Sequence, residues 1–387
     1  MTTVDDSGRA MMKTNLELIG REKINDLEAV LSFVGHYEDQ GFHRVPDNCP
    51  AEFTWDYDKG AKPQLDKLYE KAKKAQWNGQ TDLDWSIDVD QEKVVMNNAE
   101  ANQDQMLWGQ ADLSGTVLDS WGDKEWLIFG VENQNWLLSQ FMHGEQGALL
   151  CTAKIVETVP WIDAKYYAAT QVMDEARHVE VFSKYLDTKL SGHYPMNGHL
   201  GLLLDDIVSD SRWDMTYLGM QIMVEGLALA AFGFMHQLTQ EPLLKQMLRY
   251  VMADEARHVA FGVLSLQELY SELSASEMRE RQEFAFEAAV RMRDRLRSQE
   301  VWDRMGVPWN DVVTLMGRQD PNQDDFQILL FSKIVPNLRK LGLLDAADGW
   351  LRQKFTEMGV IAFENLSDST EDEDAFADGS PVTRQVA

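Results

Sequence analysis

The sequence predicts an all-α protein built on a four-helix bundle, with additional helices at its flanks. Apolar residues recur at helical spacing through most of the chain, and no stretch alternates as a strand would. The pentapeptide Asp-Glu-Ala-Arg-His occurs twice, at 174–178 and at 254–258. A glutamate precedes each copy at the same distance, which indicates an internal repeat of a helical hairpin.

The repeated motif places a carboxylate and an imidazole on one face of a helix, because residues three apart lie on the same side. The pairs are Glu175 with His178 and Glu255 with His258. Oxygen and nitrogen donors of this kind suit iron or manganese better than a metal that prefers thiolates. One such pair is weak evidence, but a four-helix di-metal site uses two, plus one glutamate from each remaining helix.

The two further glutamates are present. Glu145 and Glu225 each lie 30 residues before the glutamate of their motif, and Pro160 and Pro242 lie near the midpoints. Since proline ends or opens a helix, each span predicts two arms of about 15 residues, roughly 22 Å long. Folding back at the proline brings each lone glutamate level with its motif. The four carboxylates then offset the charge of two divalent metal ions.

The first 120 residues predict a helical extension packed on the bundle. Apolar stripes predict helices over 21–40 and 63–76, and weaker patterning predicts one over 92–117. Residues 76–85 place two tryptophans around acidic residues. This favours an irregular segment packed on the bundle, with a cover for the metal site or a partner contact as the alternative.

Residues 121–275 predict the bundle itself, with helices over 124–158, 161–190, 211–240 and 241–273 and a loop over 191–201. The third helix is apolar on nearly every side, which is typical of a buried helix. Gly144 and Gly147 beside Glu145 predict either close helix packing or room for dioxygen or substrate.

Residues 276–365 predict flanking helices over 277–304, 309–317, 324–341 and 345–358. The first has one strongly charged face, typical of an outer helix, and Ser274 or Ser276 is its expected N-cap. The acidic, Ser- and Gly-containing stretch 366–387 predicts a disordered tail.

The motifs resemble those of the ferritin-like di-iron carboxylate proteins over about residues 120–275. The Asp before Glu and the Arg before His are most similar to the oxygenase branch, such as the large subunit of bacterial multicomponent monooxygenases. The resemblance implies a ferritin-like bundle in which the six residues above bind two iron ions, as Fe/Fe or as Mn/Fe. It also implies that Asp174 and Asp254 each reach the histidine of the other motif, with Arg177 and Arg257 pairing with these aspartates.

Some positions depart from related families. Phe182, and Gly262 in the second copy, stand where ribonucleotide reductase small subunits commonly carry a radical-bearing tyrosine one turn after the first motif. Leu229 stands where the monooxygenases often have a hydroxyl-bearing residue. Together with Ala148 and Cys151, Phe182 and Leu229 predict an apolar substrate pocket, although plain core packing explains them equally well.

The resemblance implies a non-haem di-iron oxygenase that uses dioxygen to hydroxylate, N-oxygenate or desaturate a partly apolar small molecule. An external electron donor, such as a ferredoxin or a flavin reductase, is expected because the chain has no Gly-rich dinucleotide motif and no cysteine-ligated cluster. Two alternatives stay open. One is a ferritin-like protein that handles metal or removes peroxide without an organic substrate, and the other is a non-enzymatic bundle with a structural metal site.

Net charge and cysteine content limit the kinds of partner and bond that we expect. The chain has 64 acidic and 36 basic residues, a net charge of −28, so we expect no nucleic acid and no membrane partner. Cys49 and Cys151 predict neither a disulfide framework nor a thiolate site. The N-terminus lacks an apolar signal core, and no apolar run approaches the roughly 20 residues of a membrane span. We expect a cytoplasmic protein and, as the commonest oligomer, a homodimer.

Overall fold

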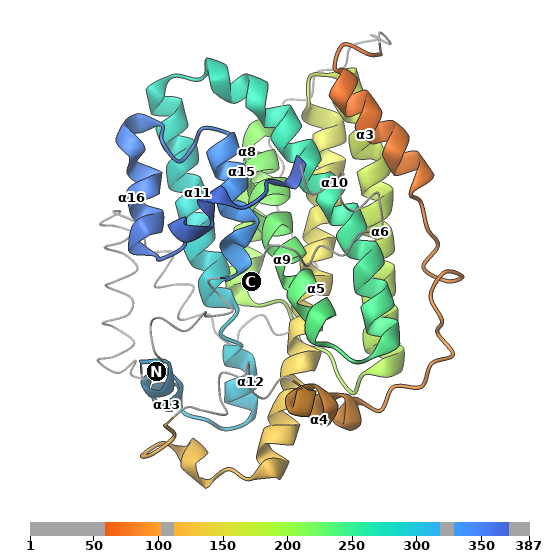
Figure 1. Cartoon of the computed structure of the whole chain (residues 1–387), viewed down its shortest axis with the longest axis vertical. Coiled ribbons are helices and arrows are strands. Elements are labelled where there is room, and N and C mark those ends of the chain that lie inside the picture. The colour runs from red at the N-terminus through yellow and green to blue at the C-terminus, as the bar shows by residue number, and fades with distance from the viewer. Residues whose placement is uncertain (1–58, 102–111, 318–328, 371–387) are drawn as a thin grey trace.

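The computed structural model describes residues 59–101, 112–317 and 329–370. Within these ranges every regular element is a helix, which confirms the all-α class (Figure 1). The predicted helix over 21–40 and Cys49 lie outside the described residues, as do residues 371–387 of the predicted tail.

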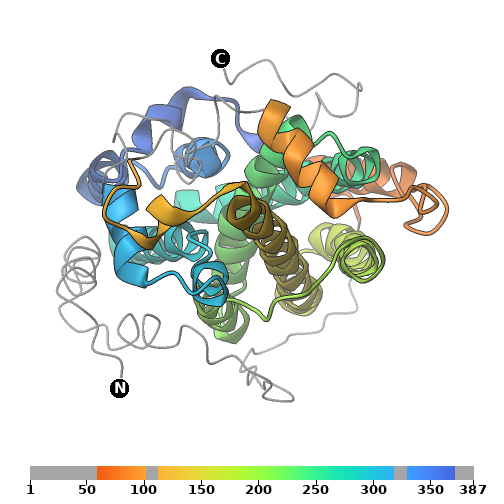
Figure 2. The same cartoon turned by 90° about the horizontal axis from the view of Figure 1, so that it is seen from below.

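Four long helical rods run side by side and form the bundle (Figures 1 and 2). Three of the rods are single helices, α5 (Asp123–Thr158), α6 (Ile162–Lys189) and α10 (Pro242–Glu272). The remaining rod consists of three consecutive elements: α8 (Trp213–Tyr217), η3 (Leu218–Val224) and α9 (Glu225–Leu238). Pro160 lies in the turn between α5 and α6, and Pro242 is the first residue of α10. The Glu241 side chain caps α10 by accepting from the amides of Leu243 and Leu244. The two hairpins therefore turn where the prolines predict.

The flanking helices share one hydrophobic core with the bundle, from Leu65 to Val360. On one side α3 (Pro63–Lys74) packs against α6 and α10, and α4 (Gln91–Ala101) packs against α5. On the other side lie α7 (Gly198–Ser209), α11 (Ala275–Arg295), η4 (Leu330–Ser332), α15 (Ile334–Lys340), η5 (Ala347–Gly349), α16 (Trp350–Glu357) and η6 (Ile361–Asn365).

A second, smaller core lies at one end of α5, where η2 (Val117–Ser120), α12 (Gln299–Arg304) and α13 (Trp309–Gly317) meet it. Phe129 of α5 stacks on Trp302 of α12, with ring centroids 4.2 Å apart. This aromatic contact ties the segment after α11 back to the start of the bundle.

Several predicted boundaries are wrong. Residues 112–116 form a turn rather than the end of a helix over 92–117. Helix α7 was not predicted, although Asn197 before an apolar run is an N-cap signal: its side chain accepts from the amides of His199 and Leu200. The predicted helix over 277–304 breaks after α11, where Ser298 takes a left-handed φ of 46°. Its N-cap is Ser274, one of the two serines expected.

Helix α11 is not an outer helix, as its charged face predicted. It lies between α7 and η3 on one side and α16 on the other, and Arg281, Arg291 and Arg295 are all buried. The predicted disordered tail also begins too early. Ser369 is fully buried, and its amide donates to Asn337 Oδ1 at 3.0 Å, so residues 366–370 pack on α15.

The rod Trp213–Leu238 corrects one further expectation. Its length and mean hydropathy of 1.6 would allow it to cross a membrane, so an apolar run of that size does exist. However, 78% of its most apolar window is buried inside the protein, which is the position of a core helix.

A π-helical segment, η3, interrupts this rod directly before Glu225. The Glu225 amide donates to the carbonyl of Met220, five residues back rather than four. Every residue of η3 is buried, and α10 approaches it at Gly262. A Cβ on Gly262 would lie only 2.6 Å from the Cβ of Gln221. Glycine at this position therefore allows α10 to pack against the widened turn.

We expect Gly262→Ala to destabilise the protein by about 1–3 kcal/mol, because the added methyl overpacks the contact with η3. Gly144→Ala in α5 is the matched control, since a Cβ there meets nothing within 4 Å and alanine favours a helix over glycine by about 1 kcal/mol. Denaturant titration of both variants measures the difference. Equal stability of the two would contradict the close approach at Gly262.

Burial of His199 in α7 makes stability depend on pH. Burial lowers its pKa from 6.5 to about 4; Asp294 opposes this shift, and Arg297, Arg291 and Arg295 add to it. The unfolded chain therefore binds a proton between pH 6.5 and 4 that the folded chain does not, and stability falls as the pH falls through this window.

We expect this histidine to remove up to about 3 kcal/mol of stability between pH 6.5 and pH 4. His199→Gln should flatten the pH dependence, whereas His193→Gln, at an exposed position, should not. Urea titrations across this pH range test the prediction, and an unchanged slope for His199→Gln would refute it.

Candidate metal centre

Six ionisable side chains converge in the middle of the bundle, and none is more than 4% exposed. They come from all four rods. Helix α5 contributes Glu145, the first residue of α9 is Glu225, α6 contributes Glu175 and His178, and α10 contributes Glu255 and His258. The structure therefore brings together the six residues that the repeated spacing indicated.

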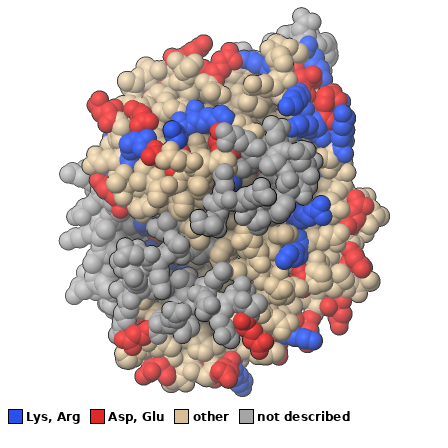
Figure 3. Space-filling model, in the orientation of Figure 1, with Lys and Arg blue, Asp and Glu red and all other residues tan. Residues whose placement is uncertain are grey.

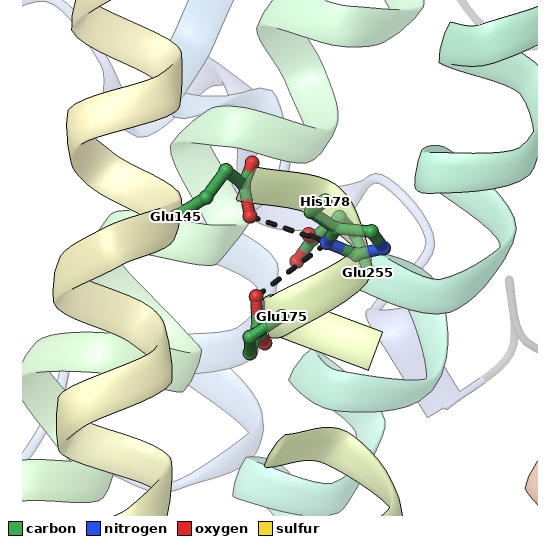
Figure 4. A group of neighbouring side chains, drawn as sticks. All are labelled: Glu145, Glu175, His178 and Glu255. Carbon is green, nitrogen blue, oxygen red and sulfur yellow. Dashed lines mark hydrogen bonds and ion pairs between the residues drawn. The ribbon is translucent and has the colours of Figure 1, made fainter. Parts of the chain in front are cut away.

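The glutamates lie around the two imidazoles in a paired arrangement. His178 Nδ1 lies 3.2 Å from Glu145 Oε2, 3.2 Å from Glu255 Oε1 and 3.5 Å from Glu175 Oε2 (Figure 4). His258 Nδ1 lies 3.0 Å from Glu175 Oε1 and 3.5 Å from Glu255 Oε2. Glu175 and Glu255 thus lie between the two histidines.

These distances define two overlapping groups of donor atoms. One contains Glu145, Glu175, His178 and Glu255, and the other contains Glu175, Glu225 and His258. Within each group the donor atoms lie within 4.8 Å of one another. Two metal ions could be held here, sharing Glu175 and Glu255, with one further glutamate and one histidine at each end.

The second nitrogen of each histidine bonds an aspartate of the opposite motif. His178 Nε2 donates to Asp254 Oδ2 at 3.1 Å, and His258 Nε2 donates to Asp174 Oδ2 at 3.3 Å. Because Nε2 is held by the aspartate, each Nδ1 faces the glutamates, and in a neutral imidazole this nitrogen would be the one that binds a metal. The exchange across the bundle also ties α6 to α10.

Two arginines compensate the charge of these aspartates. Arg177 Nη2 bonds Asp174 and lies 3.1 Å from Asp254 Oδ2, so it contacts both. Arg257 Nη2 bonds Asp254, and its Nη1 donates to the carbonyl of Ala253 at 2.8 Å. The aspartate and arginine charges therefore cancel, leaving the four glutamates as the excess negative charge.

The segment after α3 completes this aspartate layer. Gln76 Nε2 donates to Asp174 Oδ1 at 2.9 Å, and Trp77 Nε1 donates to Asp254 Oδ2 at 2.7 Å. Trp77 also stacks on Tyr250, with ring centroids 4.9 Å apart. The segment is irregular and packed on the bundle, and it covers the aspartates beside the site.

Gln171 belongs to the site, although the sequence analysis did not identify it. Its Nε2 donates to Glu225 Oε1 at 2.9 Å and to Glu175 Oε1 at 3.0 Å. It lies one turn before Glu175, on the face of α6 that carries His178. A buried polar residue continuing the ligand face was the signal that could have found it.

The electrostatics of the cluster favour binding of cations. Burial, with the neighbouring Glu255 carboxylate, raises the pKa of Glu145 to about 8, and burial with Glu175 raises the pKa of Glu225 well above its usual value. Burial opposes a charged imidazole, yet the surrounding carboxylates hold the pKa of His178 and His258 well above the usual range. Protons here take the place of positive charge that two divalent ions would supply.

Buried polar atoms without an aligned hydrogen bond also indicate a site for metal ions. Glu175 Oε2, Glu225 Oε2, both carboxylate oxygens of Glu255 and His258 Nδ1 are buried and make no well-aligned hydrogen bond, although several lie within 3.5 Å of another member of the cluster. Buried polar atoms are nearly always satisfied, so a cluster of orphaned acceptors needs an explanation. All are oxygen or imidazole nitrogen, the donor set that suits iron and manganese. The residues therefore fit a pair of such ions.

A small cavity adjoins the cluster, between α5 and α9. The space in it that is open to a water-sized sphere is about 10 Å³, which holds at most one water molecule. Of the four residues predicted for a substrate pocket, Ala148 lines it; Cys151, Phe182 and Leu229 are buried in the same core but do not. Their role in binding a substrate stays a prediction.

The two glycines beside Glu145 have different surroundings. A Cβ on Gly147 would lie 2.5 Å from Leu204 Cδ2, so this glycine permits close packing of α7. Gly144 faces open space and lines the cavity. Close helix packing therefore explains Gly147, whereas room for dioxygen or substrate beside Gly144 stays a prediction.

No known protein family matches the sequence, and no curated protein matches it. Among solved structures, the chain is similar to an R2-like ligand-binding oxidase with an aerobically reconstituted metal cofactor after photoconversion: 17% identity over 81% of this chain and 95% of that chain, with a TM-score of 0.44. Two point variants of such an oxidase, each with an anaerobically reconstituted Mn/Fe cofactor, are also similar. One is 20% identical over 78% of this chain and 95% of its own (TM-score 0.46), and the other 19% over 77% and 99% (TM-score 0.45).

We expect the metal-free protein to take up about two Fe(II) or Mn(II) ions per chain under anaerobic conditions, with a rise in thermal stability because only the folded state assembles the site. Glu175→Ala should lose both effects, since its carboxylate lies between the two positions. Glu180→Ala, at an exposed position on the same helix, should keep them. Metal analysis and calorimetry measure the outcome, and uptake of a single ion by the wild type would contradict a shared site.

Proposed function

We propose that this protein is an oxygenase that holds two iron ions, or one manganese and one iron, in the bundle and uses dioxygen to oxidise a small molecule. The observation that carries the proposal is the position of Glu175 and Glu255 between His178 and His258, in a buried cluster with unpartnered donor atoms. When bound, the metal pair would supply the electrons and the coordination positions for dioxygen reduction.

The chain's own residues would orient and shield that chemistry. Asp174 and Asp254 fix the tautomer of the two histidines, and Trp77 holds Asp254 in turn. The amide of Gln171 holds the carboxylates of Glu225 and Glu175 in place. Burial of every ligand excludes bulk water from the site.

The proposed substrate is partly apolar, and hydroxylation, N-oxygenation and desaturation are the proposed outcomes. Support comes from the cavity wall, where Phe141, Ala148, Val224 and Ala228 lie beside the glutamates. Leu229, which stands where the monooxygenases often have a hydroxyl-bearing residue, is buried. Its side chain cannot donate a proton, so proton delivery at this site would need another group.

A ferritin-like protein that handles metal or removes peroxide is the second candidate. The small size of the cavity favours it, because a space of about one water molecule is much closer to the size of peroxide than to that of an organic substrate, which requires the walls to move apart.

We further propose that an external, acidic electron donor docks at α3. This helix carries four lysines against Asp66 and Glu70, and positively charged side chains gather over it (Figure 3). Lys67, Lys73 and Lys74 are exposed, and the chain runs from this helix directly to Gln76 and Trp77 on the aspartate layer. A basic surface on a protein of net charge −28 favours a negatively charged partner at that place.

We expect protein loaded with Fe(II) to consume dioxygen and oxidise both irons on mixing with oxygenated buffer. Glu225→Ala should slow iron oxidation at least tenfold, because it removes a donor group at one end of the site. Glu180→Ala is the control. Stopped-flow absorption and an oxygen electrode measure both quantities. Metal uptake without any reaction with dioxygen would contradict the proposal and favour a structural site.

The same preparation separates the two candidate functions and tests the donor. With a reduced ferredoxin present, an oxygenase should turn over repeatedly and give an oxidised product that mass spectrometry detects, whereas a metal-handling protein should release or store iron. Charge reversal at Lys67 and Lys74 should slow ferredoxin-driven turnover, with no effect on the first, donor-independent reaction.

A further inference from the structure

Arg295 is a buried arginine that faces the metal cluster. It lies at the last position of α11 and is only 4% exposed. It lines the same cavity as Glu145, Glu225 and Glu255, together with the apolar side chains of the wall. An arginine from outside the four-helix bundle therefore forms part of the cavity wall.

The guanidinium has no anionic partner among the described residues. Its Nε and Nη1 make no hydrogen bond there. Arg291, one turn earlier on the same helix, is equally buried but pairs with Asp206 and with Glu287 at 2.8 Å. Arg281 likewise pairs with Asp214 at 3.0 Å. Arg295 is thus unlike the other buried arginines of α11.

An unpaired buried charge opposes folding, so a retained one points to a ligand. Burial, with no carboxylate to offset it, lowers the pKa of Arg295 to about 10, which still leaves it protonated at neutral pH. The glutamates that share the cavity are assigned to two divalent ions. Once they are neutralised in that way, Arg295 is the uncompensated charge at the cavity.

We propose that Arg295 binds the carboxylate of an amphipathic organic acid, which places the apolar part of that acid against Phe141, Ala148 and Ala228 beside the metal pair. The inference rests on the proposed function and names its substrate class. A guanidinium recognises a carboxylate with two parallel hydrogen bonds, which fixes orientation as well as charge. The present free volume accommodates about one water molecule, so the walls must separate when the acid enters.

The test uses protein loaded with Zn(II), which binds such donors without consuming dioxygen. Isothermal titration with hexanoate and benzoate, against hexanol, hexylamine and benzyl alcohol, should show binding of the two acids in preference to the neutral and cationic compounds. Arg295→Met should weaken the acids by about tenfold to a hundredfold, the usual effect of losing a charged hydrogen bond. Arg295→Lys should retain part of the affinity.

Arg291→Met is the matched control. It should lower the melting temperature of the ligand-free protein, because it removes the ion pairs of Arg291 with Asp206 and Glu287, without changing the affinity for acids. Arg295→Met should not lower the melting temperature, since it removes a charge that has no partner. A purely structural role of Arg295 predicts the reverse.

Two results would overturn the inference. One is no preference of the wild type for acids, and the other is equal affinity of wild type and Arg295→Met, which would mean that acids bind to the metal alone. Metal content and oxygen consumption of the iron-loaded sample separate this from the parent proposal. If the protein takes up two irons and reacts with dioxygen, but Arg295→Met does not change its affinity for acids, only the substrate class is refuted. A protein that takes up no metal refutes both.

Discussion

Electrostatic compensation of four buried glutamates is the constraint on which this structure depends. Glu145, Glu175, Glu225 and Glu255 come from four different rods and lie within a few ångströms of two imidazoles. Without positive charge they repel one another, and the raised pKa of Glu145 and of Glu225 lets these two hold protons that carboxylates in water would release. Two divalent ions remove both costs and cross-link all four rods at their centre. A metal pair at this place would therefore stabilise the bundle itself, in addition to any reaction that it supports.

The layer outside the cluster explains why the flanking helices are present. Each histidine is held by an aspartate of the other hairpin, and Trp77, which follows α3, donates to one of these aspartates. The indole N–H gives the buried carboxylate a hydrogen-bond donor at a place that water does not reach. On the opposite side α11 brings Arg295 to the cavity. The bundle supplies the donor atoms, and the added helices determine what surrounds them.

The π-helical segment η3 sets the direction in which the Glu225 side chain leaves its helix. An α-helix that entered the bundle at Trp213 would present Glu225 at a different angle, because one extra residue per turn rotates every later side chain. The widened turn crowds α10, and Gly262 provides the space. The position that lacks a tyrosine in the second motif is therefore occupied by the residue that the packing of η3 requires.

Helical periodicity and the spacing of the repeat predicted the fold class, the two hairpins that turn at proline and the six clustered residues, because both are properties of the linear chain. The sequence also indicated Ser274 as a helix cap. The contacts of Gln171, Trp77 and Arg295, the burial of α11 and the different surroundings of Gly144 and Gly147 became visible in the folded protein alone. Such features depend on which helix faces pack together, and these helices are far apart in the sequence. The charged face of α11 predicts exposure to solvent, but it is buried because other helices pack over it.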